Sequence, residues 1–144
     1  MSPPDFPFTH RLRVRWAEVD KQDIVFNGHY LTYFDVGITE YWRAVGLPYP
    51  VTRERWGTEQ YLVKATLEYL GPASFDDILD IGVRIERIGN SSLQFRLGIF
   101  RDGEHLIGGE LTYVNADPVT RKSVAVPPAM REMIEAFDRP GTTG

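Results

Sequence analysis

The chain has 144 residues, of which 42% are hydrophobic and 25% charged, as is typical of a globular protein with one domain. It contains no cysteine, which excludes disulfides and thiolate chemistry and leads us to expect a reducing, cytoplasmic location. The formal net charge of −4 argues against nucleic acid as a partner. No apolar run approaches membrane-spanning length and the N-terminus lacks a signal-peptide pattern, so we expect no membrane partner.

The first third of the chain predicts a strand followed by a long helix. Apolar residues alternate over residues 8–19, as in a strand with one buried face that includes Trp16. From Gly28 to Gly46 the spacing is that of a helix with apolar side chains around most of its circumference. Gly37 inside this helix costs roughly 1 kcal/mol relative to alanine, so we expect another element to approach it closely.

The rest of the chain predicts mainly strands. After a polar connection over residues 52–60, alternation predicts strands over residues 61–69, 79–85, 93–99, 107–113 and 123–126. The turn signals between them are Gly71-Pro72, Gly89 to Ser92, and Asp102-Gly103, and we expect a bulge at Gly108-Gly109. A short amphipathic helix follows, with an apolar face of Met130, Met133, Ile134 and Phe137.

This order predicts an α+β fold in which one curved antiparallel sheet wraps around the long helix. We expect consecutive strands to be neighbours in the sheet, and residues 1–144 to form one domain with a core of about residues 8–137. The segments up to Pro7 and after Arg139 are expected to be loose tails. An open sheet has exposed edges, which predicts a homodimer or homotetramer.

Residues that could carry chemistry lie between the first strand and the helix. Asp20 and Asp23 fall in a loop, and Asn27 stands where the helix would start. A carboxylate near a helix N-terminus suits hydrolysis, because the carboxylate can act as a base and the helix end stabilises an oxyanion. Asp20 could instead be a turn residue, whereas an N-cap role for Asn27 is compatible with an oxyanion site.

Other polar residues near this loop are open to more than one interpretation. His29 could act as a general acid, orient a substrate, or lie at the surface. We expect Asp35 and Glu40 on the helix to be solvated or structural. The three histidines lack metal-ligand spacing and no glycine-rich phosphate loop is present, so we expect no metal and no cofactor.

The stretch Arg15–Asp35, R-W-A-E-V-D-K-Q-D-I-V-F-N-G-H-Y-L-T-Y-F-D, resembles the signature of hotdog-fold acyl-CoA thioesterases of the 4-hydroxybenzoyl-CoA thioesterase family. Further similarity lies in E-Y-L-G-P-A-S-F-D-D-I-L-D-I at Glu68–Ile81 and in R-I-E-R-I-G-N-S-S at Arg84–Ser92. The resemblance covers about residues 8–137. It implies a hotdog fold and hydrolysis of an acyl-CoA thioester, and it does not indicate the acyl group.

The resemblance also implies roles for residues of the loop. Asp20 matches the family's catalytic carboxylate, which would attack the thioester carbonyl or activate a water. Asn27 matches the position whose backbone N–H binds the oxyanion, and Gly28 lets the substrate approach closely. Asp23 stands where the family usually has glycine, so it adds a second negative charge near Asp20.

Coenzyme A, as part of the substrate, would need cationic and hydroxyl donors for its phosphates. The resemblance places a nucleotide-binding turn near Arg87, Ser91 and Ser92, and His29 is a further candidate for substrate binding. Basic residues also occur at Arg84, Arg96, Arg101, Arg121 and Lys122. The alternative function is a non-catalytic acyl-CoA or fatty-acyl binding module of the same fold, whereas hotdog dehydration chemistry would normally need an Asp/His pair in a different motif.

Overall fold

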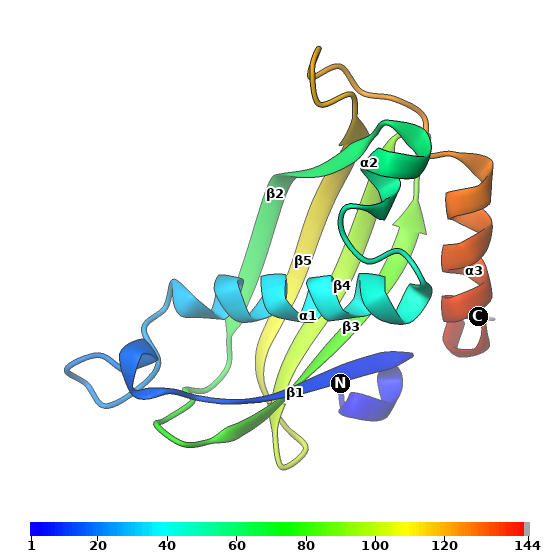
Figure 1. Ribbon diagram of the computed structural model, residues 1–144. Helices are drawn as coiled ribbons and strands as arrows, with labels where there is room; N and C mark the ends of the chain where they lie inside the picture. The colour runs from blue at the N-terminus through cyan, green and yellow to red at the C-terminus, as the bar shows by residue number, and fades with distance from the viewer. Residues whose placement is uncertain (143–144) are drawn as a thin grey trace.

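A five-stranded antiparallel sheet wraps around one long helix in the computed structural model, which describes residues 1–142 (Figure 1). The elements in chain order are β1 (Phe8–Arg13), α1 (His29–Val45), α2 (Val51–Trp56), β2 (Glu59–Tyr69), β3 (Ile78–Ile88), β4 (Ser92–Arg101), β5 (Glu104–Ala116) and α3 (Pro128–Thr142). The strand order is β1-β3-β4-β5-β2, with β1 and β2 at the edges. The predicted α+β architecture of a curved sheet around a helix is therefore confirmed.

Helix α1 is central because its apolar side chains bury themselves against the sheet. Its buried residues are Tyr30, Tyr33, Phe34, Gly37, Ile38 and Tyr41. A Cβ atom on Gly37 would lie 2.7 Å from Cγ2 of Ile81 on β3, so the predicted close approach at this glycine is confirmed. The helix ends as predicted, since Gly46 has a φ of 101° and donates its N–H to the carbonyl groups of Trp42 and Arg43.

The first strand is shorter than predicted. β1 ends at Arg13, and a 3₁₀ turn over Trp16–Glu18 follows it. This turn forms because the Glu18 carboxylate accepts the Arg15 N–H at 2.8 Å while the Glu18 N–H donates to the Arg15 carbonyl at 3.0 Å. The prediction that Trp16 lies on the buried face was wrong, because the turn leaves this side chain 81% exposed.

The middle of the chain also departs from the prediction. The polar connection over residues 52–60 contains the helix α2 and the first residues of β2. β2 does not pair with β3, the next strand along the chain, but with β5. The expected adjacency of all consecutive strands was therefore wrong at this connection, and β2 forms a free edge among the described residues.

Two local predictions near the end of the sheet were wrong. The β4–β5 register runs unbroken through Gly108 and Gly109, and a Cβ on Gly109 would overlap the ring of Phe34, so this glycine makes room for α1 instead of forming a bulge. Residues 123–126 form no strand, although Ser123 makes a single bridge to Ala116. The buried Asn115 side chain donates to two carbonyl groups in this segment, which replaces strand pairing there.

The terminal segments are more ordered than the loose tails we expected. Residues Pro3–Asp5 form a 3₁₀ helix, and the ring of Phe6 packs against Gly82 on the outer face of the sheet. At the other end α3 continues past Arg139 to Thr142, and the remaining residues 143–144 of the expected tail lie outside the described part of the chain. None of the helices in residues 1–142 has the length and hydropathy to cross a membrane.

Candidate functional site

Asp20 lies in a tight hairpin loop directly before α1. Val19 and Val25 form an antiparallel bridge, and the Asp20 N–H donates to the Ile24 carbonyl at 2.9 Å. One carboxylate oxygen of Asp20 accepts the Gln22 N–H at 2.7 Å. This contact fixes the side chain of a half-buried residue while its second oxygen makes no hydrogen bond with another described residue. One carboxylate oxygen of Asp20 is therefore held by the loop and the other has no partner among the described residues.

Asp23 closes the loop with a left-handed backbone. Its φ is 62°, and its N–H donates to the Asp20 carbonyl at 3.0 Å. Glycine adopts this conformation without steric cost, which gives a physical reason for the family's usual glycine at this position. The Asp23 side chain is exposed.

The start of α1 carries backbone N–H groups without an internal acceptor. The residue at the N-cap is Gly28, not Asn27, so the expected side-chain cap by Asn27 is not formed. The His29 N–H donates to the Phe26 carbonyl, but the N–H groups of Asn27 and Gly28 bind no backbone carbonyl in the described chain. These two groups lie at the positive end of a 17-residue helix, where a negative oxygen would be stabilised.

The end of β2 and the segment after it form hydrogen bonds with both the Asp20 loop and the start of α1. The Tyr69 hydroxyl donates to the Asn27 carbonyl at 3.3 Å, and the Val25 N–H donates to the Ala73 carbonyl at 2.9 Å. The Ala73 N–H in turn donates to the hydroxyl of Tyr30, whose pKa is raised above its ordinary value chiefly by burial. Both the loop and the helix start are therefore anchored to the same segment.

Two cavities flank the helix start. A cavity of about 440 Å³ is lined by Ile24, Val25, Asn27, Tyr30, Tyr69, Leu70, Gly71 and Pro72. A second cavity of about 380 Å³ is lined by Gly28, Leu31, Thr32, Asp35, Leu62, Leu111 and Tyr113. Both are mainly apolar, so an organic group bound at the helix start has apolar surface on either side.

The other candidate residues of this region, His29, Asp35 and Glu40, each contact different neighbours. His29 lies in the first turn of α1 with its ring 5.9 Å from that of Phe26. Asp35 lines the second cavity, where burial, followed by the charge of Asp35, raises the pKa of Tyr113 to about 12. Glu40 forms a surface ion pair with Arg43 at 3.1 Å.

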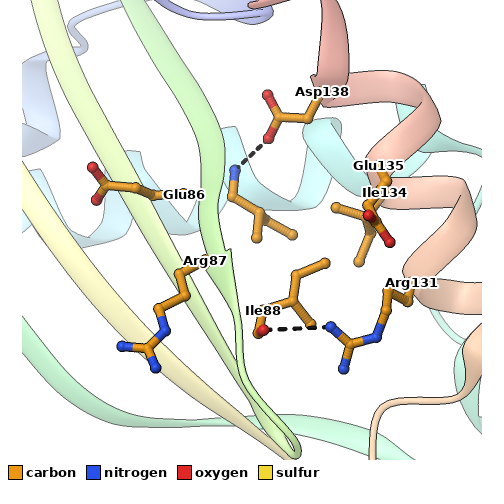
Figure 2. A pocket seen from close by; sticks show the side chains of 8 residues that line it. Glu86, Arg87, Ile88, Arg131, Ile134, Glu135 and Asp138 are labelled. Atoms are coloured by element: carbon orange, nitrogen blue, oxygen red, sulfur yellow. Dashed lines mark hydrogen bonds between the residues drawn. The ribbon is translucent and has the colours of Figure 1, made fainter. Parts of the chain in front are cut away.

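The predicted nucleotide-binding turn joins β3 to β4 beside α3. A cavity of about 360 Å³ lies between β3 and α3, and Figure 2 shows Arg87 and Arg131 among its lining residues. Arg131 donates to the carbonyl groups of Ile88 and Gly89 at 3.3 and 2.8 Å, and neither arginine pairs with a carboxylate of the described residues. The hydroxyl groups of Ser91 and Ser92 make no hydrogen bond with the side chains and backbone that the structure describes, so they are open to a ligand.

The structure separates these two groups of candidate residues within one chain. The Asp20 loop lies beside the start of β3, since Ile24 forms a bridge with Ser74, whereas Arg87 lies near the end of β3. Nine residue steps from Ile78 to Arg87 span about 30 Å of extended strand. Figure 1 likewise shows the loop before α1 far from the end of β3 beside α3.

Sequence reasoning missed two residues of the site, Glu18 and Tyr69. Glu18 is only 5% exposed, and its carboxylate accepts hydrogen bonds from Arg15 and from the Tyr33 hydroxyl. The available signal was the alternation itself, because Glu18 shares the parity of Trp16 and so places a carboxylate on the apolar face of the predicted strand. Among the described residues no three His, Asp or Glu side chains group closely enough to bind a metal ion.

Comparison with known proteins identifies the family of the chain. Residues 22–107 match the thioesterase superfamily. The chain is 27% identical to the acyl-CoA thioester hydrolase YbgC of Escherichia coli over 130 residues, which cover 83% of this chain and 90% of that protein.

Solved structures show the same relationship. A thioesterase from Thermus thermophilus, crystallised with coenzyme A and zinc, has a TM-score of 0.81 and 25% identity, over 92% of this chain and 95% of that chain. A thioesterase superfamily protein from Jannaschia has a TM-score of 0.85 and 25% identity, over 94% and 95% of the two chains. The chain therefore belongs to the thioesterase superfamily and is a thioester hydrolase with the hotdog fold.

Proposed function

We propose that this protein hydrolyses acyl-CoA thioesters, with Asp20 as the catalytic carboxylate and the N–H groups of Asn27 and Gly28 as oxyanion donors. The observation that carries the proposal is that the half-buried Asp20, with one carboxylate oxygen free of internal hydrogen bonds, lies in the loop that leads to N–H groups without internal acceptors at the start of α1. The name of the Escherichia coli relative and the coenzyme A bound to the Thermus structure support the substrate class.

The reaction needs a new C–O bond and loss of the C–S bond. In the general-base form, Asp20 accepts a proton from water as the water oxygen attacks the thioester carbonyl carbon. In the nucleophilic form, the carboxylate oxygen attacks first and water then hydrolyses the resulting anhydride. In both forms the carbonyl oxygen becomes negative and is stabilised by the N–H groups at the helix start, and the coenzyme A thiolate leaves and is protonated.

The cavities at the helix start suit the acyl group and its neighbouring atoms. Gly28 lines one cavity and has no side chain to block the approach of the carbonyl to the helix end. His29 follows in the first turn, and we assign it to substrate orientation. The apolar lining by Leu31, Leu62 and Leu111 favours an organic acyl group over water.

We infer that the active protein is a homo-oligomer. β2 is an edge strand whose Leu62, Val63 and Tyr69 side chains are exposed. A long apolar edge is a ready template for pairing with a second copy. The separation of Arg87 from Asp20 within one chain gives a second reason, because a substrate that contacts both groups could take them from two copies.

Arg87, Ser91 and Ser92 are assigned to the phosphate groups of coenzyme A. Arg87 is exposed and has no carboxylate partner among the described residues, and the two serine hydroxyls make no internal hydrogen bond there. Arg131 lines the same cavity, together with the carboxylates of Glu86, Glu135 and Asp138. Charge-assisted hydrogen bonds of this kind are strong and specific for phosphate.

A hydrolysis screen tests the substrate class. Acyl-CoA thioesters of different chain length, aliphatic and aromatic, are incubated with the protein, and the released thiol is measured. We expect thiol release from at least one thioester, in proportion to enzyme concentration. Tight acyl-CoA binding without thiol release from any member of the series would contradict the proposal and favour the binding module.

Analytical ultracentrifugation tests the oligomer. We expect a dimer or tetramer at micromolar concentration, which Val63→Lys should dissociate because the lysine would place a charge on the apolar edge. Lys64→Ala on the same strand is the matched control and should leave the assembly intact. An active wild-type monomer would contradict the inference.

A further inference from the structure

Glu18 is a buried carboxylate for which the proposed reaction has no use. It is 5% exposed, and its two oxygens accept the Arg15 N–H at 2.8 Å, the Arg15 guanidinium at 2.7 Å and the Tyr33 hydroxyl at 2.9 Å. Burying a carboxylate is costly unless such partners compensate for the lost water. Glu18 lies two residues before Asp20, so the desolvation cost of burying its carboxylate next to the proposed catalytic loop requires an explanation.

The contacts of Glu18 join two parts of the chain. Its carboxylate binds Tyr33 on α1, and its main-chain carbonyl accepts the Phe26 N–H at 2.9 Å. Phe26 lies directly before Asn27, and the Phe26 carbonyl accepts the His29 N–H that begins the helix. Glu18 therefore holds the chain that enters α1 through its backbone and holds the helix itself through its side chain.

Asp20 follows two residues after Glu18 on the same arm of the hairpin. The Val19–Val25 bridge and the Asp20–Ile24 hydrogen bond fix the backbone of this arm against the other arm, so a shift of Glu18 would also shift Asp20. On the other arm Phe26 leads to the N–H groups of Asn27 and Gly28. Glu18 thus belongs to the arm that carries Asp20 and is hydrogen-bonded through its carbonyl to the arm that leads to the oxyanion donors.

We propose that Glu18, through its hydrogen bond to Tyr33, is a positioning residue that sets the placement of the Asp20 carboxylate relative to the N–H groups at the start of α1. The expected effect on kcat rests on the proposed function, because it requires that Asp20 catalyses thioester hydrolysis. Catalytic groups must be held to within a fraction of an ångström, and a shift of about 1 Å can cost roughly 100-fold in rate. Binding of the distant nucleotide should not depend on this placement.

The chain offers a matched control for the Tyr33 contact. Tyr41 lies on the same helix, is buried, and donates its hydroxyl to the buried Asp138 carboxylate at 3.4 Å. Tyr33→Phe and Tyr41→Phe therefore remove equivalent hydroxyl groups, one beside the Asp20 loop and one at the far end of the helix. Both rings keep their packing.

The experiment measures kcat and KM for an acyl-CoA that the wild type hydrolyses. We expect Tyr33→Phe to lower kcat about tenfold with KM nearly unchanged, and Glu18→Ala to lower kcat by roughly 100-fold. Glu18→Gln, which keeps an oxygen acceptor, should recover part of the loss, and Tyr41→Phe should keep wild-type kcat. Equal kcat for the two tyrosine variants would overturn the proposal, as would a change in KM alone.

Amide hydrogen exchange separates this proposal from the proposed function. Tyr33→Phe should speed exchange of the Asp20 and Phe26 amides relative to Tyr41→Phe, whether or not the wild type turns over acyl-CoA. A wild-type protein without thioesterase activity would end the proposed function, but this comparison would still decide the role of Glu18. Unchanged exchange at both amides in Tyr33→Phe would overturn the positioning role.

Discussion

The hypothetical Cβ atom of Gly37 on α1 would lie 2.7 Å from Cγ2 of Ile81 on β3, so helix and sheet touch where the helix has no side chain. Gly37→Ala should therefore destabilise the protein by about 1–3 kcal/mol, because overpacking outweighs the gain in helix propensity. Urea unfolding measures this difference. Thr39→Ala on the exposed face of α1 is the control and should change the free energy of unfolding by less than about 0.5 kcal/mol. A more stable Gly37→Ala variant would show that α1 can move away from β3.

Asp23 tests the conformation of the catalytic loop. Its φ of 62° is strained for a residue with a side chain, so Asp23→Gly should raise the free energy of unfolding by up to about 1 kcal/mol. Because this carboxylate is exposed, thioesterase activity should persist. Thermal unfolding and thiol release measure the two effects. Loss of activity in a folded Asp23→Gly protein would mean that both carboxylates of the loop take part in the reaction.

The buried Glu18 predicts a defined pH dependence of stability. Burial alone would raise the pKa of this carboxyl, but the hydrogen bonds from the Arg15 backbone, Tyr33 and the Arg15 guanidinium hold the pKa below its ordinary value of 4.5. The folded state therefore favours the charged form, and the stability this provides is present above pH 4.5 and lost as pH falls through the folded-state pKa.

Unfolding of wild type and Glu18→Gln at a series of pH values measures this effect. The wild type should be more stable near pH 7, and the difference should shrink in the acid range. Glu40→Gln, which breaks an exposed pair with Arg43, should show only a small difference at each pH. A Glu18→Gln difference that grew on acidification would contradict the assigned direction of the pKa shift.

Arg87 tests the assignment of the coenzyme A phosphates. Arg87→Ala should raise KM for a coenzyme A thioester about tenfold and leave kcat unchanged, because the contact contributes equally before and in the transition state. The effect should weaken with added salt and be absent with a pantetheine thioester, which lacks the nucleotide. Arg43→Ala is the control, since Arg43 pairs with Glu40 on α1. An equal loss with both thioesters would make Arg87 structural and move the phosphate site to Arg121 and Lys122.

The sequence was most informative where local chemistry alone decides structure. The helical spacing from Gly28, the left-handed Gly46 and the Asp102-Gly103 hairpin are local features, and all three were predicted correctly. Periodicity could not show that β2 crosses to β5, because strand order depends on contacts between distant residues. Nor could it show the turn at Trp16, which the hydrogen bonds of the Glu18 side chain determine.

The candidate site shows the same division. Asp20, Asn27 and Gly28 lie close together in sequence, so a motif could bring them together. The hydrogen bonds that hold this region depend on the fold and were not foreseen: Tyr69 donates to Asn27, Phe26 to Glu18, and Val25 to Ala73. The distance along β3 between the Asp20 loop and Arg87 also required the structure, since the motif similarity gives no separation in space.

The most direct test of the account compares Asp20→Asn with Asp23→Asn in the thiol-release assay. Asparagine keeps the shape of either side chain but can act neither as a base nor as a nucleophile. We predict that Asp20→Asn lowers kcat by at least roughly 100-fold while the circular dichroism spectrum and the Kd for acyl-CoA stay close to wild type. Asp23→Asn should keep most of the activity. A folded Asp20→Asn protein that retained most of the wild-type kcat would contradict the assignment of Asp20 as the catalytic carboxylate.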